Sequence, residues 1–92
     1  MELVIFIGLQ ASGKSTYYRI QYSATHVHVS KDLLRNNGKP ARRQLDLIEQ
    51  ALKEGRSVIV DNTNATVAER APLIARGEQY AAAIVGCFFE TQ

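Results

Sequence analysis

A glycine-rich segment directly after a short apolar run constrains this chain more than any other feature of its sequence. Residues 3–7 are continuously apolar and rich in branched side chains, which is typical of a strand buried on both faces of a parallel sheet. Residues 8–15 follow at once, and their sequence Gly-Leu-Gln-Ala-Ser-Gly-Lys-Ser matches the pattern G-x-x-x-x-G-K-[ST] at every fixed position. A buried strand followed by this pattern predicts a phosphate-binding loop that leads into a helix.

Each fixed residue of the loop has a physical role in holding phosphate. Gly8 lets the chain leave the strand in a conformation closed to residues that carry a Cβ, and Gly13 lets the backbone approach a phosphate closely. Lys14 supplies a positive charge for the β- and γ-phosphates, and Ser15 supplies a hydroxyl ligand for Mg²⁺. Backbone N–H groups of the loop and of the first helical turn complete the anion site. The predicted nucleotide-binding residues are therefore Gly8, Ala11, Ser12, Gly13, Lys14, Ser15 and Thr16.

Apolar strands alternate with helical segments along the rest of the chain. We expect strands at residues 3–7, 26–29, 57–60 and 82–89, and helices at residues 14–22, 31–35 and 40–54 and after Thr66. This alternation predicts an α/β fold of three layers, in which helices flank a mostly parallel sheet of about four strands. The length of 92 residues, without a linker or an internal repeat, predicts a single domain over residues 1–92.

Two of these helices carry boundary signals. Residues 40–54 place apolar side chains at helical spacing opposite a charged face, and Gly55 stands where a glycine commonly ends a helix. Thr66 and Glu69 form the pattern of a capping box, and Pro72 predicts a kink in the helix that they open. The apolar face predicted for the first of these helices consists of Ala41, Leu45, Ile48 and Leu52.

A charged pair follows the predicted strand at residues 26–29. Residues at the carboxyl end of a strand in an open α/β sheet face the ligand crevice. Asp32 and Arg35 lie one helical turn apart, so Asp32 can accept the proton of an attacking hydroxyl while Arg35 holds an anionic acceptor. The alternative is that both belong to a solvated helix start, where the helix dipole favours Asp32.

A polar run, Asp61-Asn62-Thr63-Asn64, follows the predicted strand at residues 57–60. An acidic residue at the tip of an apolar strand is placed to bind Mg²⁺ directly or through water, which makes Asp61 a predicted metal ligand. Asn62 and Asn64 are predicted to orient phosphate or the acceptor. The alternative is a turn and helix-cap cluster, because Asn, Asp and Thr are common turn residues.

These three pieces together resemble the polynucleotide kinase-like group of P-loop kinases. The resemblance covers most of the chain and rests on residues 8–16, Asp32 with Arg35, and residues 61–64 with Arg70 downstream. It implies that the loop binds ATP, that Asp32 activates a 5′-hydroxyl acceptor and that Arg35 supports it. Related kinases and zeta-toxin-like proteins use small molecules, so the resemblance implies phosphoryl transfer to a hydroxyl and leaves the acceptor open.

The family pattern continues past the fourth strand into a lid helix with arginines and then a last strand. This sequence ends at Gln92, so we expect the fold to lack the C-terminal lid and the last strand. The chain is then the N-terminal part of a longer protein, or a shortened member with weak or no activity, because phosphoryl transfer relies on such charges. Apolar surface uncovered beside the strand at residues 82–89 would favour self-association through that sheet edge.

Composition restricts the partners and the cellular location that we expect for the protein. A net charge of +2 is too small to indicate a nucleic-acid partner from field strength alone. The single cysteine, Cys87, excludes an internal disulfide and is expected to be a small buried side chain. No apolar run reaches the roughly 18 residues that a membrane span needs, and no export signal is recognisable. We therefore expect a cytoplasmic protein without a membrane partner.

Two histidines and three tyrosines are assigned structural roles, each with a functional alternative. His26 and His28 alternate along one strand and are expected on its surface, the alternative being a metal pair without a third ligand. Tyr17, Tyr18 and Tyr22 are expected to pack against the sheet, although they are also suited to stacking on a base.

A basic group, Lys39, Arg42 and Arg43, fits either a solvated helix face or a contact with a nucleic-acid backbone. Taken together, the sequence predicts an ATP- and Mg²⁺-dependent kinase whose first candidate acceptor is the 5′-hydroxyl of a polynucleotide. A small-molecule kinase and a non-catalytic ATP-binding module are the alternatives, and the preference for ATP over GTP stays open. The predicted residues are Lys14, Asp32 and Arg35 for catalysis, Ser15 and Asp61 for the metal, and Asp32, Arg35, Asn62 and Asn64 for the substrate.

Overall fold

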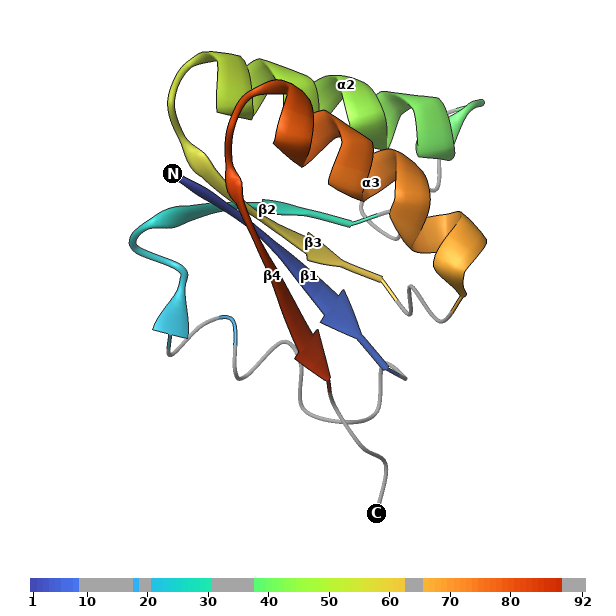
Figure 1. Ribbon diagram of the computed structural model, residues 1–92, viewed down its shortest axis with the longest axis horizontal. Coiled ribbons are helices and arrows are strands. Elements are labelled where there is room, and N and C mark those ends of the chain that lie inside the picture. Colours follow the sequence, from blue (N-terminus) through green and yellow to red (C-terminus); the bar gives the residue numbers. More distant parts are fainter. Residues whose placement is uncertain (9–17, 19–20, 31–37, 63–65, 89–92) are drawn as a thin grey trace.

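The structure of the chain, a computed structural model, describes residues 1–8, 18, 21–30, 38–62 and 66–88. Its four strands form one sheet in the order β2-β3-β1-β4, and every neighbouring pair is parallel (Figure 1). This arrangement confirms the predicted α/β fold with a parallel sheet. The strands are β1 (Glu2–Ile7), β2 (His26–Val29), β3 (Ser57–Asp61) and β4 (Ala83–Phe88).

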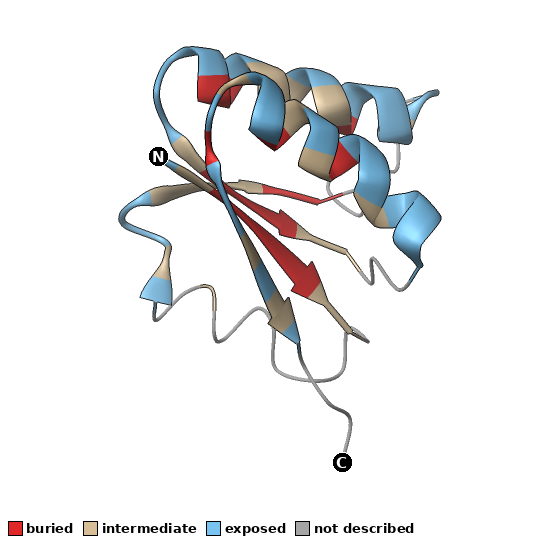
Figure 2. Cartoon of the chain, viewed as in Figure 1, coloured by how far each residue is buried: buried red, intermediate tan, exposed pale blue. Residues whose placement is uncertain are grey.

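Both faces of the sheet are covered, as the continuous apolar run of β1 predicts. Helices α2 (Pro40–Lys53) and α3 (Val67–Gln79) lie together over one face, called here the helix face (Figure 1). The buried core between these helices and the sheet draws side chains from both and includes Leu3, Ile5, Val58, Val60, Ile48, Leu52 and Leu73. Figure 2 shows the buried stretches of the strands in red. On the opposite face, called here the tyrosine face, Tyr18 and Tyr22 pack against Val4, Phe6 and Ile59. The expected packing of these two tyrosines is thus confirmed, while Tyr17 lies outside the described residues.

The predicted helix ends are also found. Gly55 adopts a φ of 79° just after α2, and its N–H donates to the Leu52 carbonyl while the Arg56 N–H donates to the Ala51 carbonyl. This pair of bonds is a Schellman motif, which needs the left-handed conformation that glycine adopts without strain. At the start of α3, the Thr66 hydroxyl accepts the Glu69 N–H at 3.1 Å. Helix α3 then continues through Pro72 to Gln79 without a break.

The buried face of α2 differs in part from the predicted one. Ile48 and Leu52 are buried as expected, but Ala41 is exposed, and Gln44 and Ala51 are buried in its place. The prediction was wrong for Ala41, although this residue lies seven positions before Ile48 and thus on the same side of the helix. Ala41 belongs to the first turn of α2, and the buried residues begin three positions later, at Gln44.

Strand β4 is the edge of the described sheet, because it pairs there with β1 alone. Its burial is consequently lower than its apolar sequence suggested: the side chains of Ile84 and Phe88 are 37% and 75% exposed. Cys87 is only partly buried, packed at the rim of the tyrosine-face cluster, so the expectation of a fully buried thiol was wrong. The position of a strand within the sheet, rather than its composition, sets this exposure.

Candidate functional site

The parallel sheet brings the described members of two predicted clusters, Gly8 and Asp61 with Asn62, to the carboxyl ends of neighbouring strands. Gly8 directly follows β1, while Asp61 ends β3 and is in register with Phe6 of β1. Gly8 has a φ of 144°, a conformation that residues with a Cβ rarely adopt. The conformation predicted for this glycine is thus found, while its part in nucleotide binding stays a prediction. Asn62 follows Asp61 at the same edge.

The described residues between β1 and β2 and those after β3 lie on opposite faces of the sheet. Tyr18 and Tyr22, which precede β2 in the sequence, pack on the tyrosine face, whereas α3, which follows β3, covers the helix face (Figure 1). Neighbouring parallel strands whose connections diverge in this way open a crevice beyond their carboxyl ends, where α/β proteins bind ligands. Gly8 and Asp61 stand at these carboxyl ends, beside the proposed crevice.

Asp61 is held on the tyrosine face by a histidine of the edge strand. His28 Nε2 lies 3.0 Å from Asp61 Oδ2, and the Asp61 side chain is only 11% exposed. The ring of Tyr18 stacks on the His28 imidazole, with 4.4 Å between ring centroids. The carboxylate is therefore both shielded from solvent and fixed through at least one of its oxygens.

Asn62 is held from the other face of the sheet. Its Nδ2 donates to Oε1 of Gln44, a residue in the first half of α2 that is 4% exposed. Buried amides need hydrogen-bond partners, and this pair supplies one to each side chain. Two consecutive residues at the end of β3 are thus fixed by two different elements.

Sequence reasoning missed both of these supporting residues. Gln44 was not among the residues predicted for the buried face of α2, and His28 was given no role at the site. A signal for Gln44 does exist, because it lies four positions before Ile48 and seven before Ala51, on the buried stripe. For His28 no comparable signal exists, since its partner lies 33 positions along the chain.

Most of the predicted loop and acceptor residues lie outside the described residues: Ala11, Ser12, Gly13, Lys14, Ser15, Thr16, Asp32, Arg35 and Asn64. Their predicted roles stay predictions. The structure does bring the flanking chain to the crevice edge, since β2 ends at Val29 and is followed there by Ser30, which is 5% exposed. Asp32 follows Ser30 by two positions in the sequence.

The donor set of the described site fits a hard cation. Mg²⁺ prefers oxygen ligands and commonly keeps only one or two carboxylates beside phosphate and water oxygens. Asp61 offers such a carboxylate, and within the described ranges no group of three or more His, Cys, Asp or Glu side chains gathers around a point. A cation at Asp61 would therefore draw its other ligands from phosphate, water and the predicted Ser15 hydroxyl. Among the same residues, no helix is long and apolar enough to cross a membrane.

Comparison with solved structures assigns this arrangement to the P-loop kinase class. The APS kinase CysC of Mycobacterium tuberculosis matches 98% of the chain with a TM-score of 0.73 at 18% identity, the chain covering 76% of that structure. At this identity the likeness shows the fold. A chain of the Pnkp1/Rnl/Hen1 complex matches 99% of this chain with a TM-score of 0.82 at 25% identity, and the match covers 36% of that chain.

The family follows from the sequence comparison. A family model described as an AAA domain matches residues 3–92, and the chain therefore belongs to this family. The bifunctional polynucleotide phosphatase/kinase of Schizosaccharomyces pombe is 34% identical over 70 residues, which is 75% of this chain. A putative bifunctional polynucleotide phosphatase/kinase of Acanthamoeba polyphaga mimivirus matches to the same extent. The chain spans 16% of the length of each of these relatives.

Proposed function

We propose that this chain forms the nucleotide-binding part of a kinase that transfers the γ-phosphate of ATP to a hydroxyl, with the 5′-hydroxyl of a polynucleotide as the first candidate acceptor. The observation that carries the proposal is the pair of features at the carboxyl ends of β1 and β3, where Gly8 has a positive φ and the Asp61 carboxylate is shielded from solvent. The polynucleotide kinase names of the two curated relatives support the acceptor.

The chemistry assigns one task to each predicted residue. Lys14 and the loop N–H groups hold the phosphates, while Ser15 and Asp61 hold Mg²⁺, which when bound neutralises charge on the phosphate oxygens. The oxygen of the acceptor hydroxyl bonds to the γ-phosphorus, and Asp32 accepts the proton of that hydroxyl. The bond from that phosphorus to the β–γ bridging oxygen breaks, and ADP leaves.

Two kinds of residue then orient the acceptor. Arg35 holds the anionic group next to the reacting hydroxyl by a bidentate contact. Asn62 and Asn64 orient phosphate or acceptor through their amides. Because Gln44 holds the Asn62 side chain, this amide is already ordered before any ligand arrives.

The direct test is transfer of labelled γ-phosphate to a panel of acceptors. The panel contains 5′-hydroxyl DNA and RNA oligonucleotides, the same oligonucleotides with a 5′-phosphate, and small alcohols. We expect label on the 5′-hydroxyl oligonucleotides only. A Lys14→Ala variant is expected to lose about tenfold or more in ATP affinity, since it removes a charge-assisted contact to phosphate. Label on a small alcohol alone would mean that the acceptor is a small molecule. If ATP binds but no acceptor is labelled, the chain is a non-catalytic ATP-binding module.

A basic patch at the start of α2 favours a polynucleotide over a small acceptor. Lys39, Arg42 and Arg43 are exposed there, and the first turn of the helix contains no acidic residue. Cations at a helix N-terminus are disfavoured by the helix dipole, so helix stability does not explain their position. Because α2 begins near the carboxyl edge of the sheet, where Gln44 reaches Asn62, the patch lies beside the proposed crevice.

Neutralising this patch should weaken acceptor binding in a salt-dependent way. For an Arg42→Gln, Arg43→Gln double variant, we expect a higher KM for a single-stranded oligonucleotide. The slope of log affinity against log salt should fall by about 0.7 for each phosphate that the variant no longer neutralises. The matched control is Lys53→Gln with Arg56→Gln, which removes the same charge at the far end of the same helix. Equal effects from both double variants would exclude a local contact by the patch.

A further inference from the structure

Strand β2 carries two histidines in closely similar settings at its two ends. Both lie on the tyrosine face, and each is covered by a tyrosine ring: Tyr22 meets His26 edge-on, and Tyr18 stacks on His28. Each imidazole also reaches a carboxylate from another strand. The two pairs differ in what their carboxylates do.

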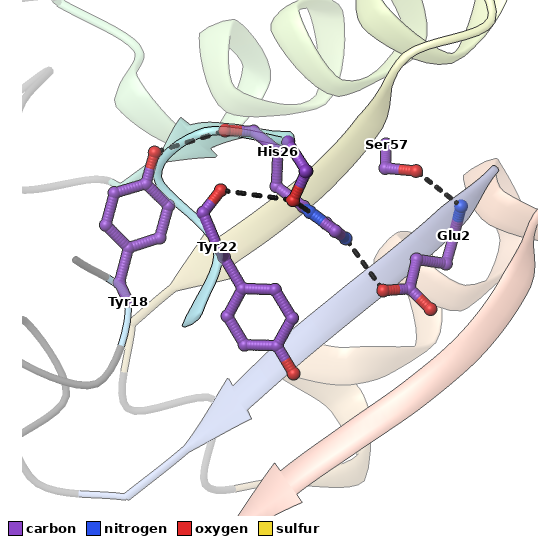
Figure 3. Close-up of polar contacts among 6 residues, drawn as sticks. Glu2, Tyr18, Tyr22, His26 and Ser57 are labelled. Atoms are coloured by element: carbon purple, nitrogen blue, oxygen red, sulfur yellow. Dashed lines mark hydrogen bonds and ion pairs between the residues drawn. The ribbon is translucent and has the colours of Figure 1, made fainter. Parts of the chain in front are cut away.

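The first pair joins the amino ends of two strands. His26 Nε2 lies 2.7 Å from Glu2 Oε1, and the Glu2 N–H donates to the Ser57 hydroxyl at 2.9 Å (Figure 3). The Tyr18 hydroxyl donates to the His26 carbonyl at 3.1 Å, and the Thr25 hydroxyl lies 2.7 Å from His26 Nδ1. These contacts lie at the amino ends of the strands, whereas Gly8 lies at the carboxyl end of β1. They therefore hold the strands together at the end of the sheet away from the crevice.

The second pair lies at the crevice itself. His28 Nε2 is 3.0 Å from Asp61 Oδ2, and the stacked Tyr18 ring restricts the plane of the imidazole. Rotation about the Cβ–Cγ bond sets the direction of both oxygens of an aspartate carboxylate. An N–H donated to one oxygen fixes that rotation and thus the direction of the other oxygen.

We propose that His28 is a positioning residue for the metal ligand Asp61. It donates its Nε2–H to Oδ2 and holds the carboxylate in the orientation in which it meets Mg²⁺ or a water bound to Mg²⁺. This inference rests on the proposed function, since it requires Asp61 to serve the cation of Mg·ATP. Residues that hydrogen-bond a metal ligand in this way typically contribute 10–100-fold to metal affinity.

The test measures binding rather than turnover. The affinity of ATP is determined by calorimetry with and without Mg²⁺, and Mn²⁺ binding to the ATP complex is followed by electron paramagnetic resonance. For His28→Ala we expect the metal-dependent gain in ATP affinity to fall about tenfold, while the metal-free ATP affinity stays within about twofold. An unchanged metal-dependent gain would overturn the proposal.

Two amide variants separate positioning from folding. In His28→Gln the side-chain N–H reaches about as far as the imidazole Nε2, so the gain should be restored in part. In His28→Asn the same amide group stops short, and the loss should match that of His28→Ala. If Asn and Gln behave alike, the bond to Asp61 is not what matters and the proposal fails, even if His28→Ala does not fold.

Two more variants complete the design. His26→Ala removes the same kind of side chain from the same face of the same strand, at the amino end of β2 and away from the crevice. It should leave the metal-dependent gain in ATP affinity intact. An equal loss in His26→Ala would assign the effect to the sheet. Asp61→Asn should abolish the gain. If Asp61→Asn keeps the metal-dependent gain, the metal role of Asp61 in the proposed function is wrong. If Asp61→Asn abolishes the gain but His28→Ala leaves it unchanged, only the positioning role of His28 is wrong.

Discussion

An Asp32→Asn variant is expected to transfer phosphate about 10²–10⁴-fold more slowly while its affinity for Mg·ATP changes by no more than about twofold. The substitution keeps the size and one oxygen of the side chain but removes the group that accepts the proton of the acceptor hydroxyl. Asp32 lies outside the described residues, and the last described residue before it is the buried Ser30, which follows β2 at the carboxyl end of the strand. Single-turnover transfer and calorimetric titration measure the two quantities separately.

Asp46→Asn is the matched control for this variant. Asp46 is exposed on α2 and lies outside the proposed site, so the same loss of charge there should leave transfer unchanged. If Asp32→Asn transfers phosphate at the rate of the original chain, Asp32 belongs to a solvated helix start. The assignment of the proton acceptor would then be wrong, although ATP binding by the loop would be untouched.

A Phe6→Ala variant is expected to lose about 3–5 kcal/mol of the free energy of unfolding. Phe6 is fully buried on the tyrosine face, where it contacts the cluster of Val4 and Ile59 and lies 6.1 Å from the Tyr22 ring, centroid to centroid. Small domains are stable by about 5–15 kcal/mol in total, so a loss of this size consumes much of the margin. Urea denaturation followed by circular dichroism measures it.

Phe88→Ala supplies the comparison on an exposed phenylalanine. Phe88 is 75% exposed on the edge strand β4, so its removal should cost well under the amount expected for Phe6. Similar losses from the two variants would mean that the tyrosine face is not a closely packed core. Because Phe6 is in register with Asp61, loosening this core should also disturb the crevice.

Local sequence signals predicted the frame of the molecule well. The apolar runs marked the strands to within a residue, and Gly8 and Gly55 were recognised because a positive φ strongly favours glycine. The end of β3 at Asp61 was also expected. Each of these features depends on neighbours in the sequence, which a pattern can show.

Features that depend on distant partners escaped the sequence. The hydrogen bond between Asn62 and Gln44 joins residues 18 positions apart, and His28 gains a role because β2 lies next to β3 in the sheet. The exposure of Cys87 likewise follows from the strand order, which places β4 at the edge. Strand order and cross-strand contacts are properties of the assembled sheet, so no short stretch of sequence contains them.

The all-parallel sheet also determines when the crevice can exist. Parallel neighbouring strands are joined by long crossovers, so contacts between them link residues far apart in the sequence. The hydrogen bond between Glu2 and Ser57 spans 55 positions, and the contact between His28 and Asp61 spans 33. Pairings of such long range form slowly, because the chain must give up the entropy of loop closure before the two strands meet. During synthesis the segment around Gly8 leaves the ribosome well before Asp61. For that interval β1 has neither neighbour, and the nascent chain is open to pairing with other strands.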